Sequence, residues 1–261
     1  MFLFKKSVKE TWLEVNFGQV KGWQCTPFLE FSNLKHLFTS KSNDLNLAKH
    51  ELTIFPEKSV EKNRETLCKS LDLSYEDLFI LPIVHSDNIL VLGNETKTIS
   101  EADAIITHLT NIPFLITYAD CVPILLFAPE KKVVGLIHAG WKGTCAKITE
   151  KTIIAMQENY LVRPSQIFAA IGPAIGQKNY EVSQEIADLL VQSCESDEIL
   201  DNSGPKPKAD LKLTNYIQLD RAGVMKIFVS ELDTALHNSK LYSYRIQGKR
   251  AGRQGLIACI T

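Results

Sequence analysis

The chain has 261 residues, of which 45% are hydrophobic and 23% charged, a composition that is typical of a folded globular protein and argues against a disordered or fibrous one. Its 29 basic and 30 acidic residues give a formal net charge of -1, so no overall positive field favours a nucleic acid or an anionic membrane as a partner. The apolar runs stay well short of the roughly 20 residues that a membrane-spanning helix needs.

The N-terminal part of the chain predicts strands, one helix and a further strand. Residues 1–60 mix short apolar runs with polar breaks, a pattern of strands joined by surface loops. Residues 59–73 carry apolar side chains at helical spacing, with Ser59 as a candidate N-cap. Residues 79–85 then predict a short buried strand that ends at His85.

The rest of the chain alternates strand and helix patterns. Successive apolar runs at 104–110, 112–119, 122–129 and 133–139 predict the core of the sheet structure. A helix capped by Thr144 is predicted over 143–160, and one capped by Asp210 over 210–224. Further predictions are a helix over 183–194, a loop over 201–210, and strands over 167–172, 240–246 and 255–260. This order predicts a single α/β domain spanning residues 1–261, in which mixed β-sheets are layered with helices.

Cysteine usage and the start of the chain bear on localisation. The six cysteines (25, 68, 121, 145, 194 and 259) are scattered and form no C-x-x-C pair, so they are interpreted as reduced thiols. Only four apolar residues precede Lys5 and Lys6, too few for the apolar core of a secretory signal. We therefore expect a cytoplasmic protein.

Three potential metal ligands, His85, Cys121 and His138, stand at the ends of strand-like runs. They lie 36 and 17 residues apart, unlike the short paired spacings of a zinc finger. If the fold brings them together, two imidazoles and a thiolate form a three-ligand zinc site with an open fourth position, as in catalytic zinc centres. The alternative is a buried Cys121 that acts as a small apolar residue beside two unrelated histidines. Spacing alone does not decide between them.

The segments "ADCVPILLF" and "VVGLIHAGWKGT" carry a family resemblance. Together they resemble the signature of the laccase-domain family, once described as multicopper polyphenol oxidoreductases and now interpreted as zinc-dependent purine nucleoside phosphorylases with adenosine deaminase activity. The similarity spans about residues 38–258 and includes "FTSK", "LNL", "NR", "DAIIT", "IGPAIGQKNYEV" and "YSYRIQGKRAGRQGLI". It implies an α/β/β/α sandwich and a zinc ion bound by His85, Cys121 and His138.

The resemblance also implies substrates and residue roles. Phosphate would attack a purine nucleoside (adenosine, inosine, guanosine or 5'-methylthioadenosine) and release the free base and a (methylthio)ribose 1-phosphate. Adenosine would also be deaminated. Cys121, His138 and Asp120 are the expected catalytic residues. The expected substrate- and phosphate-binding residues are Arg64, Lys142, Arg245, Arg253 and His237, although each basic side chain could instead be a solvated charge or part of a structural ion pair.

The chain departs from the family pattern at several positions. The first ligand usually follows a glutamine, but here Ile83 lies two residues before His85, and Ser86 replaces the usual glycine after it. Lys142 replaces an arginine and cannot bind an anion through a planar fork. Asp233 replaces a cysteine near the C-terminus. Substrate contacts could therefore differ from those of the family.

Three other functions compete with the phosphorylase. Cys121 could be a nucleophile that His138 activates, in a metal-free thiol hydrolase or amidase. A multicopper oxidase is rejected because it needs many histidines in close-set pairs, whereas this chain has six histidines and no H-x-H. A non-catalytic zinc- or nucleoside-binding protein would bind adenosine without turnover.

Overall fold

The computed structural model describes residues 11–48, 57–93 and 101–261. Residues 1–10, on which the prediction about a secretory signal depends, lie outside these ranges. So do residues 49–56, the last part of the strand-and-loop region predicted at the N-terminus.

The first of two six-stranded sheets combines both ends of the described chain. Its strand order is β1-β2-β3-β14-β7-β4, and all neighbours are antiparallel except β4 and β7. The strands are β1 (Trp12–Phe17), β2 (Val20–Cys25), β3 (Leu34–Thr39), β14 (Gln254–Ile260), β7 (Phe114–Tyr118) and β4 (Phe79–Ile80).

The second sheet has the order β13-β10-β8-β9-β6-β5, with parallel pairs only at its two edges. Its strands are β13 (Lys226–Val229), β10 (Phe168–Ile171), β8 (Val122–Ala128), β9 (Val133–Ala139), β6 (Ala104–Thr107) and β5 (Ile89–Leu92). A separate antiparallel pair joins β11 (Leu200–Asp201) to β12 (Lys208–Ala209), within the region predicted as loop.

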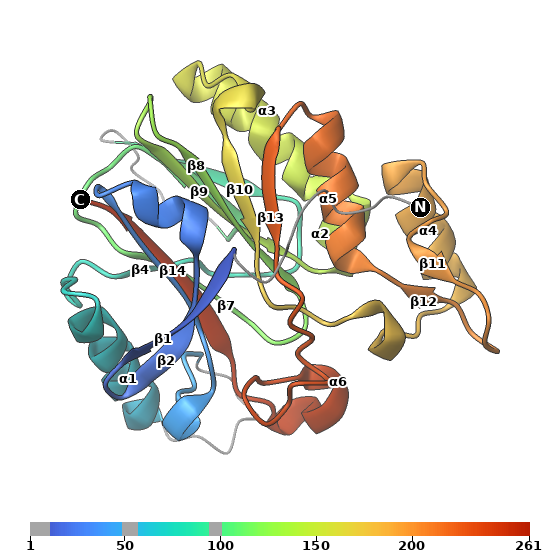
Figure 1. Ribbon diagram of the computed structural model, residues 1–261, viewed down its shortest axis with the longest axis horizontal. Coiled ribbons are helices and arrows are strands. Elements are labelled where there is room, and N and C mark those ends of the chain that lie inside the picture. Colours follow the sequence, from blue (N-terminus) through green and yellow to red (C-terminus); the bar gives the residue numbers. More distant parts are fainter. Residues whose placement is uncertain (1–10, 49–56, 94–100) are drawn as a thin grey trace.

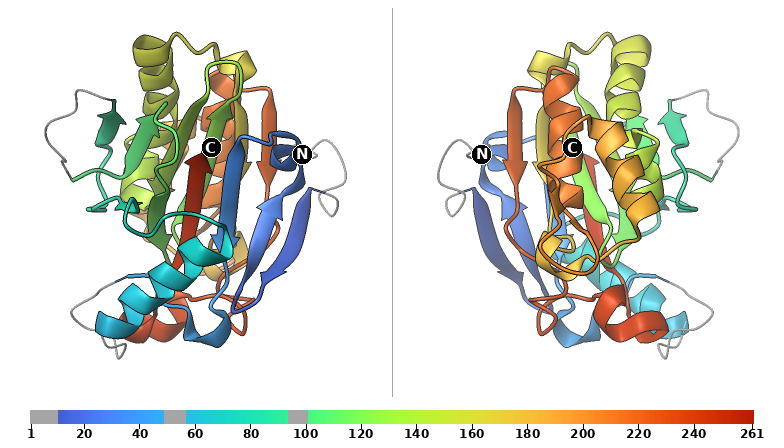
Figure 2. Two further views of the ribbon diagram at one scale, coloured as in Figure 1. Left: turned by 90° about the vertical axis from the view of Figure 1, so that its left-hand side faces the viewer. Right: turned by 90° about the vertical axis from the view of Figure 1, so that its right-hand side faces the viewer.

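The two sheets pack face to face and helices cover their outer faces (Figures 1 and 2). Helix α1 (Glu57–Ser70) packs on the first sheet through Leu67 and Cys68. Three helices lie on the second sheet: α2 (Trp141–Cys145), α3 (Ile148–Tyr160) and α5 (Leu211–Arg221). Helix α4 (Gln184–Cys194) packs beside α2 and α5. Helix α6 (Tyr244–Gln247) lies near the end of the first sheet. The predicted α/β/β/α sandwich of mixed sheets is confirmed.

The central hairpin explains why the apolar runs are continuous. Every residue of β8 and β9 is buried, because one face of these strands contacts the helices and the other contacts the first sheet. Ile124 and Leu126 pack on the helix side, whereas Leu125 and Phe127 pack between the sheets. Strands covered on both faces lose the alternation of polar and apolar residues that marks a half-exposed strand.

The prediction of a strand over residues 79–85 is wrong beyond Ile80, where β4 ends. Pro82 has no amide hydrogen with which to continue a ladder. The amides of Val84 and His85 donate instead to the carboxylate of Asp103, and His85 adopts a left-handed conformation with φ 60°. The Asp103 carboxylate therefore accepts the hydrogen bonds that main-chain oxygens of a neighbouring strand would otherwise accept.

Three predicted helix features are also corrected. The helix expected over 143–160 is divided into α2 and α3 by Lys147, whose φ is 60°, so Thr144 lies inside α2 rather than capping a helix. Helix α1 begins before Ser59, which is therefore not its N-cap. The strand expected over 240–246 is absent, because Ser243 caps α6 by accepting a hydrogen bond from the Ile246 amide.

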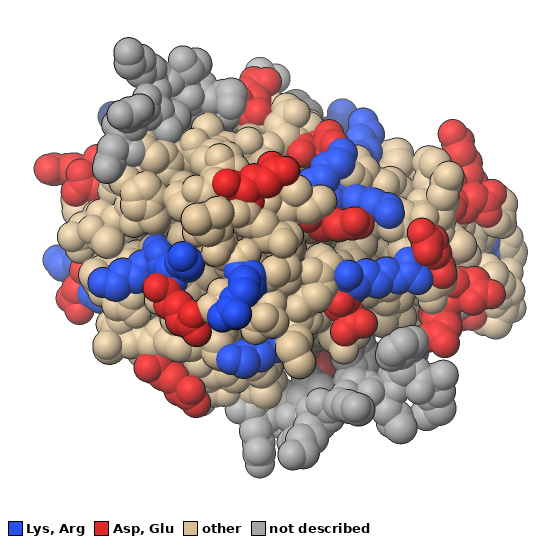
Figure 3. Space-filling model, turned by 90° about the horizontal axis from the view of Figure 1, so that it is seen from above, with Lys and Arg blue, Asp and Glu red and all other residues tan. Residues whose placement is uncertain are grey.

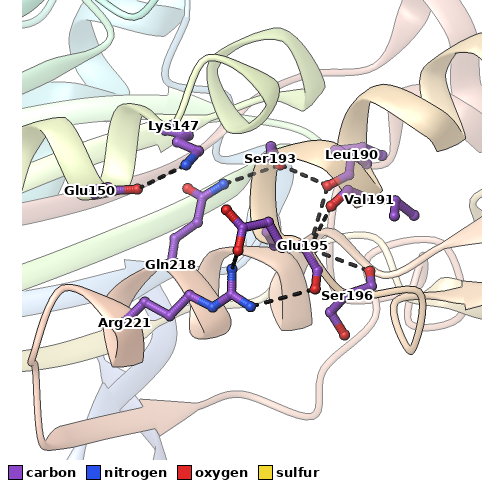
Figure 4. Close-up of polar contacts among 10 residues, drawn as sticks. Lys147, Glu150, Leu190, Val191, Ser193, Glu195, Ser196, Gln218 and Arg221 are labelled. Atoms are coloured by element: carbon purple, nitrogen blue, oxygen red, sulfur yellow. Dashed lines mark hydrogen bonds and ion pairs between the residues drawn. The ribbon is translucent and has the colours of Figure 1, made fainter.

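The helices predicted over 183–194 and 210–224 are confirmed as α4 and α5, and polar contacts hold them beside the second sheet. Asp210 caps α5 by accepting a hydrogen bond from the Leu213 amide at 2.9 Å. Figure 4 shows Gln218 of α5 donating to Ser193 of α4 (3.3 Å), and the ion pair between Arg221 and Glu195. Gln218 also donates to the Thr144 carbonyl oxygen of α2 at 2.9 Å. These bonds fix the short helix α2 against α4 and α5.

The outer surface carries charges of both signs. Figure 3 shows lysine and arginine side chains interspersed with aspartate and glutamate on the face that it presents. Among the residues that the structure describes, none of the helices is long and apolar enough to cross a membrane.

The imidazole of His36, in β3, is a buried group that can bind a proton in acid. It is fully buried, and its Nε2 accepts a hydrogen bond from the Cys25 amide at 3.0 Å. Burial lowers the pKa of His36 from 6.5 to about 4. Between these two values the unfolded chain binds a proton that the folded chain does not, so the free energy of unfolding falls as the pH falls.

We predict that His36 weakens the fold by up to roughly 3 kcal/mol between pH 7 and pH 4. Urea unfolding at both pH values would measure this loss. His36→Gln keeps an acceptor for the Cys25 amide but cannot ionise, so its loss of stability on acidification should be smaller. Equal losses in the two proteins would contradict the assignment to His36.

Candidate metal centre and active site

His85, Cys121 and His138 converge at one end of the β8–β9 hairpin. Val122 pairs with Ala139 in the ladder, which places Cys121, one residue before β8, close to the end of β9 that carries His138. His85 comes from the loop after β4. The ligand atoms of the three residues lie within 4.8 Å of one another, and the two imidazole rings stand at 90° with centroids 5.0 Å apart. This cluster could hold a metal ion.

Gly140 forms part of the boundary of this cluster. A Cβ atom at this position would lie 3.2 Å from the Cys121 Sγ and 3.4 Å from the His85 Cδ2. Its backbone angles, φ -72° and ψ 172°, suit any residue, so a larger side chain here is opposed by the close neighbours and not by the backbone conformation.

Gly140→Ala is expected to weaken metal binding by about tenfold or more, because the added methyl displaces the Cys121 and His85 side chains from their present geometry. Competition with a chromophoric chelator would measure the affinity. Gly93→Ala is a suitable control, since among the described residues its Cβ would meet only the His108 Cε1, at 3.9 Å. Equal metal affinity of Gly140→Ala and the wild type would show that the methyl is accommodated.

Asp103 organises two of the three candidate ligands. It precedes β6 by one residue, and the pairing of Ala104 with Ile137 brings it opposite His138. Its Oδ1 lies 2.9 Å from the His138 Nδ1 and also accepts from the His85 amide at 2.9 Å. Its Oδ2 accepts from the amide and the hydroxyl of Ser86, at 2.7 and 2.9 Å. A hydrogen bond at Nδ1 leaves the His138 Nε2 available to a metal.

The electrostatics of the cluster favour a thiolate. Burial by itself raises the pKa of the Cys121 thiol, but His138 and His85 outweigh it and lower that pKa to about 6. Burial likewise lowers the pKa of His138, but Cys121 and Asp103 raise it to about 9. Burial also opposes ionisation of Asp103, yet hydrogen bonds from His138 and Ser86 hold its pKa below the usual value. The two imidazoles therefore favour the thiolate of Cys121, the form that binds metals or attacks electrophiles.

The cluster opens into a cavity of about 750 Å³. Its lining combines the three candidate ligands with aromatic side chains (Tyr118, Trp141, Tyr180 and Tyr244), the apolar stretch 80–83, and three arginines (Arg64, Arg245 and Arg253). This size and mixture of apolar and charged groups suit a small organic molecule that carries an anion.

The three arginines of the lining are held in place by main-chain oxygens. Arg64 Nε donates to Leu47 O at 2.8 Å, and Arg253 Nη1 to Ala251 O at 2.7 Å. Arg245 donates to Asn179 O and Glu181 O, at 3.3 and 3.1 Å. Each guanidinium has five N–H donors, more than these bonds use.

Two of the arginines also lie over tyrosine rings of the lining. The guanidinium of Arg245 stands 5.1 Å from the ring centre of Tyr180, and that of Arg253 stands 5.7 Å from that of Tyr244. All four residues belong to the lining, so positive charge and aromatic rings lie together in the cavity wall.

Not all predicted site residues reach the cavity. Asp120 lines it, with its carboxylate bonded to the Thr234 hydroxyl and the Arg245 amide. Lys142 is exposed, 5.7 Å from the ring centre of Trp141, and is not in the lining. His237 is also outside the lining, and its Nδ1 lies 3.1 Å from the Asp233 amide. The assignment of Lys142 and His237 to substrate binding stays a prediction.

Sequence analysis missed Asp103 and Gly140. Asp103 is the first residue of the segment "DAIIT". Its place opposite His138 depends on the pairing of β6 with β9, which the sequence does not reveal. Gly140 stands between a strand and a helix, where a glycine could equally serve close packing. A buried acid at the start of an apolar strand is the one signal that could have pointed to Asp103.

Known proteins share this fold and much of this sequence. Residues 36–261 match the family model described as multi-copper polyphenol oxidoreductase laccase. A protein of Deinococcus radiodurans named purine nucleoside phosphorylase is 31% identical over 238 residues, which cover 88% of this chain and 92% of that protein. The purine nucleoside phosphorylase YlmD of Geobacillus stearothermophilus is 32% identical over 208 residues, covering 74% of this chain and 76% of that protein.

A solved structure agrees with the sequence matches. The crystal structure of YlmD from Geobacillus stearothermophilus superposes with a TM-score of 0.86 at 26% identity, covering 96% of this chain and 98% of that one. The segment that matches the family model contains all three candidate ligands, the arginines of the cavity and both sheets apart from β1, β2 and the first two residues of β3. The chain therefore belongs to the multi-copper polyphenol oxidoreductase laccase family.

Proposed function

We propose that this protein is a zinc-dependent purine nucleoside phosphorylase with adenosine deaminase activity, and that it acts in the cytoplasm. The observation that carries the proposal is the cluster of His85, Cys121 and His138 in the wall of a cavity that also presents arginines and aromatic rings. The names of the relatives support the phosphorylase part of this proposal.

The donor set is suitable for zinc. Two imidazole nitrogens and a thiolate leave the fourth tetrahedral position for a water or a substrate atom. The space next to Gly140 would be filled by any larger side chain, and the Asp103 carboxylate holds the His138 ring. His85, Cys121 and His138 would hold the ion. When bound, zinc lowers the pKa of a coordinated water to about 7 and polarises an oxygen of the substrate.

The residues of the chain would bind and orient both substrates. Arg64, Arg245 and Arg253 would hold phosphate through charge-assisted hydrogen bonds. Tyr180 and Tyr244 would provide flat surfaces for the purine. A phosphate oxygen would then form a bond to the anomeric carbon while the bond from that carbon to the purine nitrogen breaks. The proton of the attacking hydrogen phosphate would pass to the departing purine nitrogen, so that the base would leave as a neutral molecule.

One observation favours a second candidate function. In this function Cys121 would be the nucleophile and His138 its base, and the Asp103 carboxylate would orient the His138 ring. This is the arrangement of a thiol hydrolase. In that case iodoacetamide would alkylate Cys121 rapidly in the protein as isolated. If the thiolate binds zinc, it should be protected until a chelator removes the metal.

The proposal is tested by expressing the protein without a histidine tag and following adenosine by chromatography, with and without phosphate. Adenine release that requires phosphate would support the phosphorylase, and inosine formation would support the deaminase. Mass spectrometry of the same sample should find about one zinc per chain. Bound zinc without turnover would indicate a binding protein, and a metal-free, rapidly alkylated Cys121 would indicate the thiol hydrolase.

A further inference from the structure

Asp120 lies next to Cys121 in sequence, but both oxygens of its carboxylate accept hydrogen bonds from other segments. Its Oδ1 accepts from the Thr234 hydroxyl at 2.5 Å, and its Oδ2 accepts from the Arg245 amide at 2.6 Å. Its main-chain oxygen accepts from the Ile175 amide at 3.0 Å. Asp120 is only 8% exposed, so these bonds are largely shielded from water.

The segments that meet at Asp120 form one wall of the cavity. Ile175 lines it directly, and Arg245 lines it while stacking on Tyr180. The Arg245 amide belongs to the first turn of α6, where amides lack partners within the helix. Ser243 caps the Ile246 amide and Asp120 caps that of Arg245, so the position of α6 depends on both side chains. Tyr244 is carried by the same turn.

We propose that Asp120 is a positioning residue, which fixes the wall formed by Tyr244, Arg245 and Ile175 at a set distance from Cys121. The inference rests on the proposed function, because that wall would bind the nucleoside. In this role Asp120 acts through other residues, because its two carboxylate oxygens hold the Thr234 hydroxyl and the Arg245 amide.

Two substitutions separate the geometry of Asp120 from its charge. Its φ is 85°, a left-handed conformation that asparagine adopts readily. In Asp120→Asn the amide oxygen can accept from the Arg245 N–H, and the amide nitrogen can donate to the Thr234 hydroxyl, which is able to accept. Asp120→Asn therefore keeps the bonds and loses the charge, whereas Asp120→Ala loses both.

The experiment compares steady-state kinetics with adenosine at saturating phosphate, zinc content, and hydrogen exchange of a peptide covering residues 243–248. Asp120→Ala should raise KM for adenosine by about tenfold or more, with a smaller effect on kcat, because a misplaced wall binds the nucleoside less well. Its zinc content should equal that of the wild type, and residues 243–248 should exchange faster. Asp120→Asn should have a KM for adenosine close to that of the wild type, and its residues 243–248 should exchange slowly, as in the wild type.

Two results would overturn the proposal. A loss of about a hundredfold in kcat for Asp120→Asn at full zinc content would assign Asp120 to proton transfer or substrate contact. Unchanged exchange of residues 243–248 in Asp120→Ala would show that it does not hold α6. If Asp120→Ala fails to fold, Thr234→Val removes one of the same bonds with little change of shape. Hydrogen exchange needs no substrate, so it remains decisive even if no purine nucleoside is turned over.

Discussion

Cys121→Ser is expected to retain less than about one-tenth of the wild-type zinc and to lose phosphorolysis by at least about a thousandfold. A serine hydroxyl stays protonated at neutral pH, whereas the neighbouring imidazoles lower the pKa of the Cys121 thiol to about 6 and so favour its ionised form. The fold should survive, because the side chain is only half-buried and borders the cavity. Metal analysis, turnover and circular dichroism of one sample would measure all three effects.

Cys145→Ser is the matched control for this substitution. Cys145 is also half-buried and lies at the end of α2, but it does not belong to the candidate ligand cluster. It should keep its zinc and its turnover. A Cys121→Ser protein with full zinc and full activity would contradict the proposed role of the thiolate. Loss of zinc in both variants would mean that the site is sensitive to any change nearby.

Asp103→Asn is expected to weaken metal binding by about tenfold to a hundredfold and to destabilise the fold by about 3 to 5 kcal/mol. The carboxylate is fully buried and accepts hydrogen bonds from main-chain amides, from Ser86 and from His138. An asparagine has only one acceptor oxygen, and its NH₂ group would face donors that it cannot satisfy. Chelator competition and denaturant unfolding, with and without metal, would separate the two effects.

Asp87→Asn provides the control, because Asp87 lies in the loop of His85 and Ser86 but forms an ion pair with Lys151 at the surface. Exposed pairs of this kind contribute at most about 1 kcal/mol. Its metal affinity should match that of the wild type. The account of Asp103 would be contradicted if both variants lost stability and metal affinity to the same extent.

The strands of the core could be predicted because burial on both faces leaves a continuous apolar run. The runs around β6, β7, β8 and β9 were all found in this way. Their division between two sheets could not be predicted, since an apolar run reports burial and not the identity of the neighbouring strand. β7 belongs to the first sheet and pairs with β14, more than a hundred residues away in sequence.

The candidate ligands could be named from the sequence, but the loop of His85 could not be described. Residues 81–85 look like a strand because they are mainly apolar, yet the Asp103 carboxylate accepts hydrogen bonds from the amides of Val84 and His85. Similarly, the pattern of residues 240–246 predicts a strand, but Ser243 caps the short helix α6 at this position. At residues 84–85 the backbone conformation depends on the side chain of Asp103, which is distant in the sequence. At residues 243–246 it depends on the side chain of Ser243, which caps a short helix.

The proposed metal dependence is tested most directly by measuring turnover against zinc content. Protein stripped with a chelator is reloaded in steps, and phosphate-dependent adenine release is recorded together with zinc per chain in each sample. Turnover should rise from zero in proportion to zinc and stop rising at about one zinc per chain. Undiminished turnover in the stripped protein would contradict the account, because the cluster of His85, Cys121 and His138 would then act without a metal.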